Sequence, residues 1–215
     1  MPDAYDRGMP PLRVFRIPFS TNVERVALAA GHKGIEIEWI EVDPADRSPV
    51  EAASGQPLVP VLLDGDETIV DSTAIIDHLE RLRPEPPLYP LDEARRAEVS
   101  VFVDWFNRVW KRPPNLIAAE LEQPQPDTAA VNRLSARMHA ELDRFESLLA
   151  GRPYFFDEFG VVDCVAFPFL KYPVLGLPPG DDELFHRILV EHQPLGGGYP
   201  RLKAWVARVD ERPRA

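Results

Sequence analysis

The dipeptide Val59-Pro60 and its neighbours constrain the fold of this chain more than any other feature. It lies in Gln56-Pro57-Leu58-Val59-Pro60-Val61-Leu62-Leu63, shortly before Glu67-Thr68-Ile69-Val70-Asp71-Ser72. Proline lacks a backbone N–H, so within a sheet it is confined to a strand start, an edge or a bulge. We expect Pro60 to open a strand. A cis bond after Val59 would expose the Val59 backbone to a ligand, whereas a trans bond would leave an ordinary edge proline.

The segments on either side of this dipeptide predict the element order βαβ-ββα. Apolar runs and period-two alternation predict strands at 12–17, 35–42, 61–63 and 68–70. Helical spacing predicts one helix that begins at Ser20 or Thr21 and ends at Gly31, and another that begins at Ser72. Residues 44–55 are expected to form a loop with one irregular helical turn. This order is typical of a thioredoxin-like α/β domain.

A proline-rich segment follows, with four prolines in the seven positions 84–90, which predicts a stiff linker. Beyond it, strand signals are scarce and apolar residues recur at helical spacing. Pro113-Pro114 is expected to kink or end the first of these helices. The expected helices cover residues 93–110, 127–149, 161–170, 182–191 and 199–209. The predicted organisation is a thioredoxin-like domain at 12–83, a linker at 84–90 and an all-helical domain at 91–210.

Composition excludes several classes of function. The formal net charge of −11 argues against nucleic acid or an anionic membrane as a partner. Cys164 is the only cysteine, so the chain has neither an internal disulfide nor a CxxC redox pair. No stretch approaches the roughly 20 apolar residues of a membrane span, and the polar start at 1–11 lacks a signal core. The five histidines lack metal-ligand spacing. We expect a cytoplasmic protein without a metal site.

Hydroxyl groups stand at both expected helix starts of the first domain. Ser20 follows the first strand, where unpaired helix amides and the positive end of the helix dipole stabilise an anion such as a thiolate. Asp71-Ser72 precedes the later apolar helix. Each position on its own is also compatible with simple helix capping. Ser20, Val59-Pro60 and Asp71-Ser72, taken together in this order and spacing, indicate a thiol-binding site much more specifically than any one of them does.

These residues resemble the glutathione transferase family. The segment 18–26 is similar to the active-site turn and first helix of that family, with Ser20 five residues before Arg25. Val59-Pro60 is similar to its cis-proline dipeptide, and Asp71-Ser72 to its acid-serine pair. The segment 159–163 is similar to the capping box of the core helix in its C-terminal domain.

The resemblance implies a homodimer that uses glutathione as co-substrate. Val59 would pair with the cysteinyl backbone, Asp71 and Ser72 would hold the γ-glutamyl end, and Ser20 would stabilise the thiolate for attack on a small hydrophobic electrophile. Gln56 and Asn22 would line the same site. Another low-molecular-weight thiol such as mycothiol stays open, and the acceptor is not indicated.

Three positions depart from the family pattern, and two alternative functions stay open. Thr21 stands where many relatives have proline, Asp71 where Glu is commoner, and Gly160 where Ser or Thr caps the core helix. One alternative is a binding or interaction protein of the same fold with little or no catalysis. The other is a thiol-dependent isomerase, dehalogenase or peroxidase. A serine at position 20 argues against thiol-transfer chemistry that requires cysteine.

Overall fold

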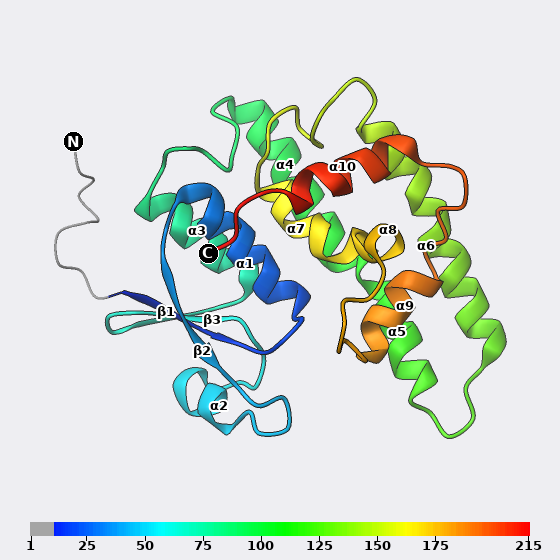
Figure 1. The fold of residues 1–215 in the computed structure, drawn as a ribbon, viewed down its shortest axis with the longest axis horizontal. Helices are drawn as coiled ribbons and strands as arrows, with labels where there is room; N and C mark the ends of the chain where they lie inside the picture. Colours follow the sequence, from blue (N-terminus) through cyan, green and yellow to red (C-terminus); the bar gives the residue numbers. More distant parts are fainter. Residues whose placement is uncertain (1–10) are drawn as a thin grey trace. The chain divides into compact units, whose positions relative to one another are not determined.

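The computed structural model describes residues 11–215, which divide into two compact units. The first unit contains residues 11–90 together with Arg212–Ala215, and the second is Leu91–Glu211 (Figure 1). Residues 1–10, which include most of the polar start discussed above, lie outside the described part. No helix within residues 11–215 is both long and apolar enough to cross a membrane.

The first unit has the thioredoxin-like arrangement that the sequence predicts. Within the described residues its sheet has four strands in the order β2-β1-β3-β4, with β1 parallel to β2 and antiparallel to β3. Helices α1 and α3 pack against each other (Figure 1). The elements are β1 Leu12–Arg16, α1 Thr21–Lys33, β2 Ile37–Glu41, α2 Ser48–Ser54, β3 Val61–Asp64, β4 Glu67–Val70 and α3 Ser72–Leu82.

Two local expectations in this unit were wrong. Helix α1 does not end at Gly31 but continues to Lys33, and Gly34 ends it in the left-handed conformation with φ of 62°. Gly31 serves a different purpose, because a Cβ there would lie 2.2 Å from the carbonyl oxygen of Pro213. The expected loop at 44–55 contains a regular helix, α2, which Gly55 ends with φ of 74°.

One hydrophobic cluster in the core of the first unit joins the sheet to α1 and α2. Its buried residues come from β1, α1, the segment after β2, α2 and the start of β3, so the chain around Pro60 is anchored in the core. They are Phe15, Val23, Val42, Val50, Val59 and Val61.

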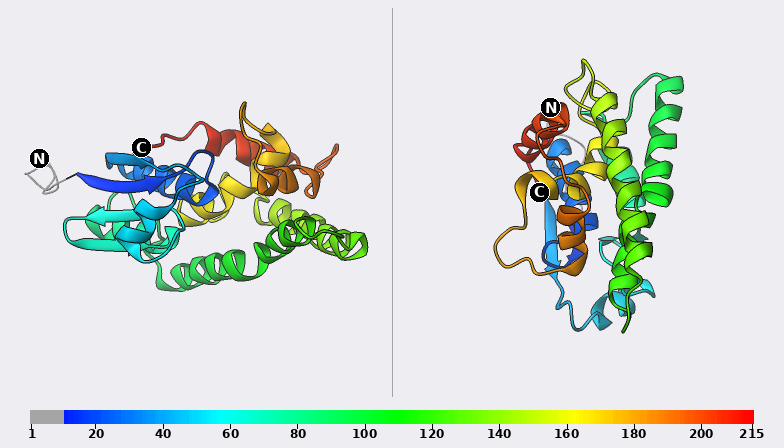
Figure 2. Two further views of the ribbon diagram at one scale, coloured as in Figure 1. Left: turned by 90° about the horizontal axis from the view of Figure 1, so that it is seen from below. Right: turned by 90° about the vertical axis from the view of Figure 1, so that its right-hand side faces the viewer.

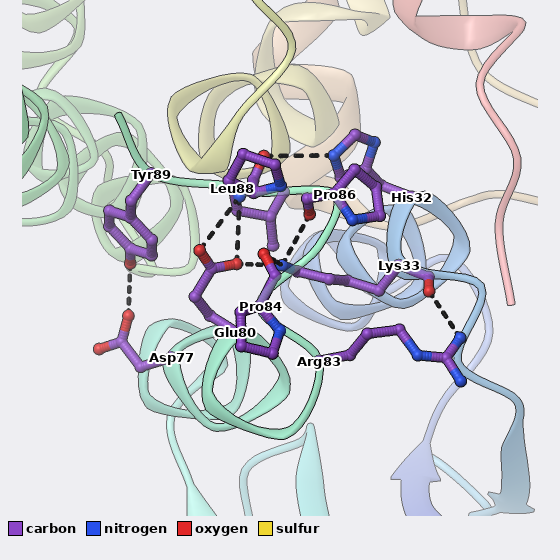
Figure 3. A network of polar contacts seen from close by, with 10 residues as sticks. His32, Lys33, Asp77, Glu80, Arg83, Pro84, Pro86, Leu88 and Tyr89 are labelled. Carbon is purple, nitrogen blue, oxygen red and sulfur yellow. Dashed lines mark hydrogen bonds and ion pairs between the residues drawn. The ribbon is translucent and has the colours of Figure 1, made fainter. Parts of the chain in front are cut away.

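The proline-rich segment at 84–90 is held against the first unit by a buried ion pair. The side chain of Lys33 is fully buried, pairs with Glu80, and donates from Nζ to the carbonyl oxygens of Pro84 (3.1 Å) and Pro86 (2.8 Å). Glu80 in turn accepts from the N–H of Leu88 (Figure 3). The ends of α1 and α3 therefore fix the path of this segment.

The second unit consists of helices in the described residues, as the sequence predicts. Helices α5 and α6 form a hairpin (Figures 1 and 2). Pro113-Pro114 does not end the helical run, because both prolines occupy the first turn of α5, where proline is tolerated. The elements are α4 Glu93–Trp105, the π-helical turn Phe106–Trp110, α5 Arg112–Leu121, α6 Thr128–Leu148, α7 Val161–Leu170, α8 Tyr172–Leu175, α9 Leu184–Glu191 and α10 Pro200–Asp210.

Helix α7 is buried along its whole length, and Asp163 fixes its start. The carboxylate of Asp163 accepts from the backbone N–H of Gly160 (3.0 Å), from that of Phe155 (3.3 Å) and from Nε1 of Trp205 (2.7 Å). Gly160 has no side chain, so only the Asp163 half of a capping box is present. Asp163 thus connects α7, α10 and the loop before α7.

Candidate functional site

The strand register gathers three chain segments at one edge of the sheet. Phe15 near the end of β1 pairs with Val61 at the start of β3, and Val61 pairs with Val70 at the end of β4. The turn that leaves β1, the dipeptide that enters β3 and the residues that follow β4 must therefore lie at the same edge. These segments carry Ser20, Val59-Pro60 and Asp71-Ser72.

Two helices also begin at this edge, because α1 follows β1 and α3 follows β4. The first turn of a helix has backbone N–H groups without intrahelical partners and carries the positive end of the helix dipole. Two such ends at one sheet edge favour an anionic ligand or a thiolate there.

Ser20 caps helix α1. Its hydroxyl oxygen accepts from the N–H of Val23 at 3.4 Å, and its own carbonyl accepts from Glu24 at 3.0 Å. Phe19 just before it has φ of 59° and is 40% exposed. The chain thus turns sharply out of β1 and leaves the half-buried Ser20 hydroxyl beside the first amides of α1. Capping uses an acceptor position of that hydroxyl and leaves its proton available.

The Val59-Pro60 bond is cis, which is the alternative that exposes the Val59 backbone to a ligand. Both residues are buried, and Val59 packs in the core cluster with Phe15 and Val23. Within residues 11–215, the backbone N–H and C=O of Val59 make no hydrogen bond, because β3 starts only at Val61.

Gln56, predicted as a site residue, uses its side-chain amide to hydrogen-bond the loop that leads to Val59. Its Oε1 accepts from the N–H of Leu58 at 2.7 Å, and its Nε2 donates to the carbonyl of Leu58 at 2.9 Å. Asn22 lies half-buried in the first turn of α1. These positions are close to the site in the chain, and the contacts of Gln56 point to loop support.

Asp71 and Ser72 form the start of α3. The Asp71 carboxylate caps the helix by accepting from the N–H groups of Thr73 (2.8 Å) and Ala74 (3.2 Å). Asp71 has φ of 74° and ψ of 127°, a conformation that L-residues adopt rarely and at a cost of order 1–3 kcal/mol. Residues with such strain are found preferentially at active sites and ligand sites. Ser72, next to it, is 3% exposed.

The structure adds one residue that sequence reasoning did not select, Arg25. It lies on α1, is only 1% exposed, and donates from Nη1 to the Ser72 hydroxyl at 3.3 Å. Arginine is rarely buried unless it is paired, so the burial of Arg25 indicates a specific role for its side chain. Its partner, 47 residues away in the chain, is not visible in the sequence.

Other candidate groups do not form a site. Cys164 is buried in α7 with no exposed surface. Within residues 11–215 no group of three or more His, Cys, Asp or Glu side chains could hold a metal ion. Two histidines pair with carboxylates instead, His78 with Asp64 and His186 with Asp181.

Comparisons with known proteins agree with this geometry. Family models described as the N-terminal and C-terminal domains of glutathione S-transferase match residues 14–87 and 128–208. A stringent starvation protein A homolog of Haemophilus influenzae is 30% identical over 87% of this chain and 80% of that protein. Glutathione S-transferase Z2 of Arabidopsis thaliana is 39% identical over 40% of each chain.

Among solved structures, a theta class glutathione S-transferase from Xanthomonas axonopodis pv. citri, with glutathione bound, superposes with a TM-score of 0.70. It is 25% identical and covers 95% of both chains. The fold, both family models and these relatives together show that the chain belongs to the glutathione S-transferase family.

Proposed function

We propose that this protein binds glutathione at the sheet edge formed by the ends of β1 and β4 and the start of β3, and activates its thiol. The observation that carries the proposal is the register of Phe15, Val61 and Val70, which brings Ser20, Val59 and Asp71-Ser72 together. The unbonded backbone of Val59 offers an N–H and a C=O to the cysteinyl backbone. Asp71 and Ser72 hold the γ-glutamyl end.

Ser20 is the group that stabilises the thiolate. Its hydroxyl accepts from the amide of Val23, so its proton is available for the sulfur. The first amides of α1 and the helix dipole act in the same direction and lower the thiol pKa below its free value of about 8.5. The thiolate then attacks a small hydrophobic electrophile, and transfer, isomerisation, dehalogenation or peroxide reduction differ only in this acceptor. We place the protein in the cytoplasm as a homodimer.

The replacement Ser20→Ala tests this role. Loss of the hydroxyl proton should lower the conjugation rate by roughly 10²-fold and raise the pKa of the bound thiol toward its free value. Glutathione affinity should change little, because Val59, Asp71 and Ser72 remain. Ultraviolet absorbance of the thiolate against pH, calorimetric titration and turnover on a panel of electrophiles measure the three quantities.

The control for this replacement is Ser20→Gly, which costs the cap of α1 only a few tenths of a kcal/mol, adds no charge and cannot donate to the sulfur. If activity is lost through the cap alone, Ser20→Gly will be nearly as active as the wild type. Unchanged turnover in Ser20→Ala would remove the proposed role of the serine, and absence of binding at millimolar glutathione would remove the site.

A second candidate function is a binding or interaction protein of the same fold with little or no catalysis. Its support is that relatives matched over most of their length include proteins named for stringent starvation, and another relative is named for FtsZ localisation. Binding of glutathione in the titration without turnover of any electrophile would favour it over the transferase.

A further inference from the structure

We propose that Arg25 is a positioning residue of this site, which orients the Ser72 hydroxyl as a hydrogen-bond donor to a carboxylate of the bound thiol. The inference rests on the proposed function and assigns a residue to its γ-glutamyl end. Its basis is the hydrogen bond from Arg25 Nη1 to Ser72 Oγ at 3.3 Å, between two side chains that are 1% and 3% exposed.

The chemistry of the two groups fixes the direction of this bond. A guanidinium group has only donors, so the Ser72 oxygen must accept. A serine hydroxyl has one proton and rotates freely until its partners fix it. Once an acceptor position is taken by Arg25, the proton is directed away from the guanidinium. Within residues 11–215 the Ser72 hydroxyl donates to no other group.

The surroundings of Ser72 select an anionic acceptor for that proton. Ser72 is the first residue of α3, where the N–H groups and the helix dipole favour negative charge. The Asp71 carboxylate is turned to the N–H groups of Thr73 and Ala74 and so serves the helix as its cap. Arg25 stays charged at any working pH and polarises the hydroxyl, which strengthens the bond that the hydroxyl donates. The fitting partner is the α-carboxylate of a γ-glutamyl group.

The contact of Arg25 assigns it to one end of the site, because its side chain donates to Ser72. Arg25 is one turn beyond Ser20 on α1, while Ser72 begins α3. A change at Arg25 should therefore be felt at the γ-glutamyl end rather than at the sulfur. This separates the proposed role from the role of Ser20.

Four variants test the proposal: Arg25→Met, Arg25→Lys, Ser72→Ala and the double variant Arg25→Met/Ser72→Ala. Calorimetry should show that Arg25→Met weakens glutathione binding about 10-fold, as loss of a hydrogen bond to a charged group does. The double variant should bind no more weakly than Ser72→Ala, because Arg25 acts through Ser72. Cysteinylglycine, which lacks the γ-glutamyl carboxylate, should bind the wild type and Arg25→Met equally.

Kinetics separate positioning from a merely structural role. Arg25→Met should raise the KM for glutathione while kcat at saturating glutathione is unchanged, whereas a distorted fold would lower kcat as well. Arg25→Lys keeps the charge but not the fork, so its affinity should lie between those of wild type and Arg25→Met, and it replaces Arg25→Met if that variant does not fold. Arg13→Met, which removes an exposed arginine from the same unit, is the matched control and should bind as wild type does.

The outcomes distinguish this proposal from the proposed function. Suppose that the wild type binds glutathione. If the effects of Arg25→Met and Ser72→Ala on affinity are then additive, or if Arg25→Met loses as much affinity for cysteinylglycine as for glutathione, the role of Arg25 is overturned and the site stands. Wild type that binds no glutathione would overturn both.

Discussion

At the scale of single residues, Gly31 shows how a residue can be misinterpreted when its neighbours in space are unknown. Glycine inside a helical pattern suggests a helix end, yet α1 continues for two further residues and Gly34 provides the left-handed cap. The reason for Gly31 is steric. The backbone of Pro213 approaches so closely that a Cβ would lie 2.2 Å from its carbonyl oxygen.

The close approach of Pro213 to Gly31 predicts that Gly31→Ala changes stability in opposite directions in the full chain and in a chain shortened at its C-terminal end. Gly31→Ala should destabilise the full chain by about 1–3 kcal/mol, because the segment Arg212–Ala215 must move away. In a chain that ends at Glu211, the same substitution should stabilise by up to about 1 kcal/mol through helix propensity. Urea denaturation of both pairs measures the two differences. Equal signs in the two backgrounds would contradict the steric explanation.

At the scale of elements, Asp163 holds α7, α10 and the preceding loop together through three buried or half-buried donors. Asp163→Ala leaves the N–H groups of Gly160 and Phe155 and the Trp205 indole without their acceptor. We expect a loss of about 3 kcal/mol in the free energy of unfolding, measured by urea denaturation. Phe145→Leu, which changes the size of a buried side chain without removing an acceptor, should cost less than Asp163→Ala.

The ionisation of Asp163 adds a pH dependence. Burial raises the pKa of Asp163 from 3.8 to about 6, against the opposing hydrogen bonds from Trp205, Gly160 and Phe155. Between these two values the folded state binds the proton more tightly than the unfolded state, so stability from this group rises as the pH falls from about 6 toward 4. The stability difference between wild type and Asp163→Ala should therefore grow over this range. A difference independent of pH would contradict it.

The effect of His32 on the pH dependence of stability is opposite to that of Asp163. His32 lies where α1 meets the segments 84–90 and 212–215. Its Nε2 lies 3.4 Å from the carbonyl of Pro87 (Figure 3). Its Nδ1 lies 2.7 Å from the Arg212 guanidinium. A carbonyl only accepts and a guanidinium only donates, so both contacts require the neutral ring with its proton on Nε2. Burial lowers the pKa of His32 below 6.5, and Arg212 and Lys33 add to this, while the Pro87 carbonyl and Glu80 oppose it.

Because the folded state disfavours the protonated ring, this contribution to stability is complete above pH 6.5 and is lost as the pH falls toward the lower folded pKa. His32→Gln, which does not titrate, should show a smaller decrease in stability from neutral to mildly acidic pH than the wild type. Burial also lowers the pKa of His192. Both proteins contain this residue, so its contribution to the pH dependence cancels in the comparison. Parallel pH profiles would exclude His32 as the source.

At the scale of the whole molecule, the first unit is discontinuous in sequence. The segment Arg212–Ala215 joins residues 11–90. Nε1 of Trp39 donates to the carbonyl of Ala215 at 3.1 Å, the N–H of Ala215 donates to Ala27, and Arg214 pairs with Glu24 at 3.2 Å. This unit therefore depends on residues that come more than a hundred positions after its last strand and helix.

Removal of residues 212–215 should destabilise the first unit. Three hydrogen bonds are lost, those between Trp39 and Ala215, between Ala215 and Ala27, and between Arg212 and His32. With net values near 1 kcal/mol each they give an expected loss of about 3 kcal/mol, with little added by the partly exposed ion pair. Thermal unfolding should shift downward by several degrees, and Trp39 fluorescence, isolated by comparison with Trp39→Phe, should report the change in its surroundings. An unchanged midpoint would show that the segment covers α1 without stabilising it.

Much of this fold follows from local patterns in the sequence. Alternation over 35–42, the capping hydroxyl of Ser20, the strand-opening Pro60 and the apolar run at 161–170 each predict an element that the structure contains. The positions of Ser20, Val59-Pro60 and Asp71-Ser72 at element ends could be predicted, because turn and cap chemistry marks such ends in the sequence. Their role as a site stays a prediction. Helix α2 was missed because its seven residues carry too little periodicity to separate a helix from an irregular turn.

By itself the sequence determined the order of the elements, because propensity, capping and periodicity act over a few residues. Only the tertiary structure decided the partners: Arg25 with Ser72, Lys33 with Glu80, and Gly31 with Pro213. Each of these contacts joins residues more than forty positions apart, and each depends on how the chain reverses between them. The local sequence indicates that a charge or a small residue is required, and the packing of the elements determines which group it meets.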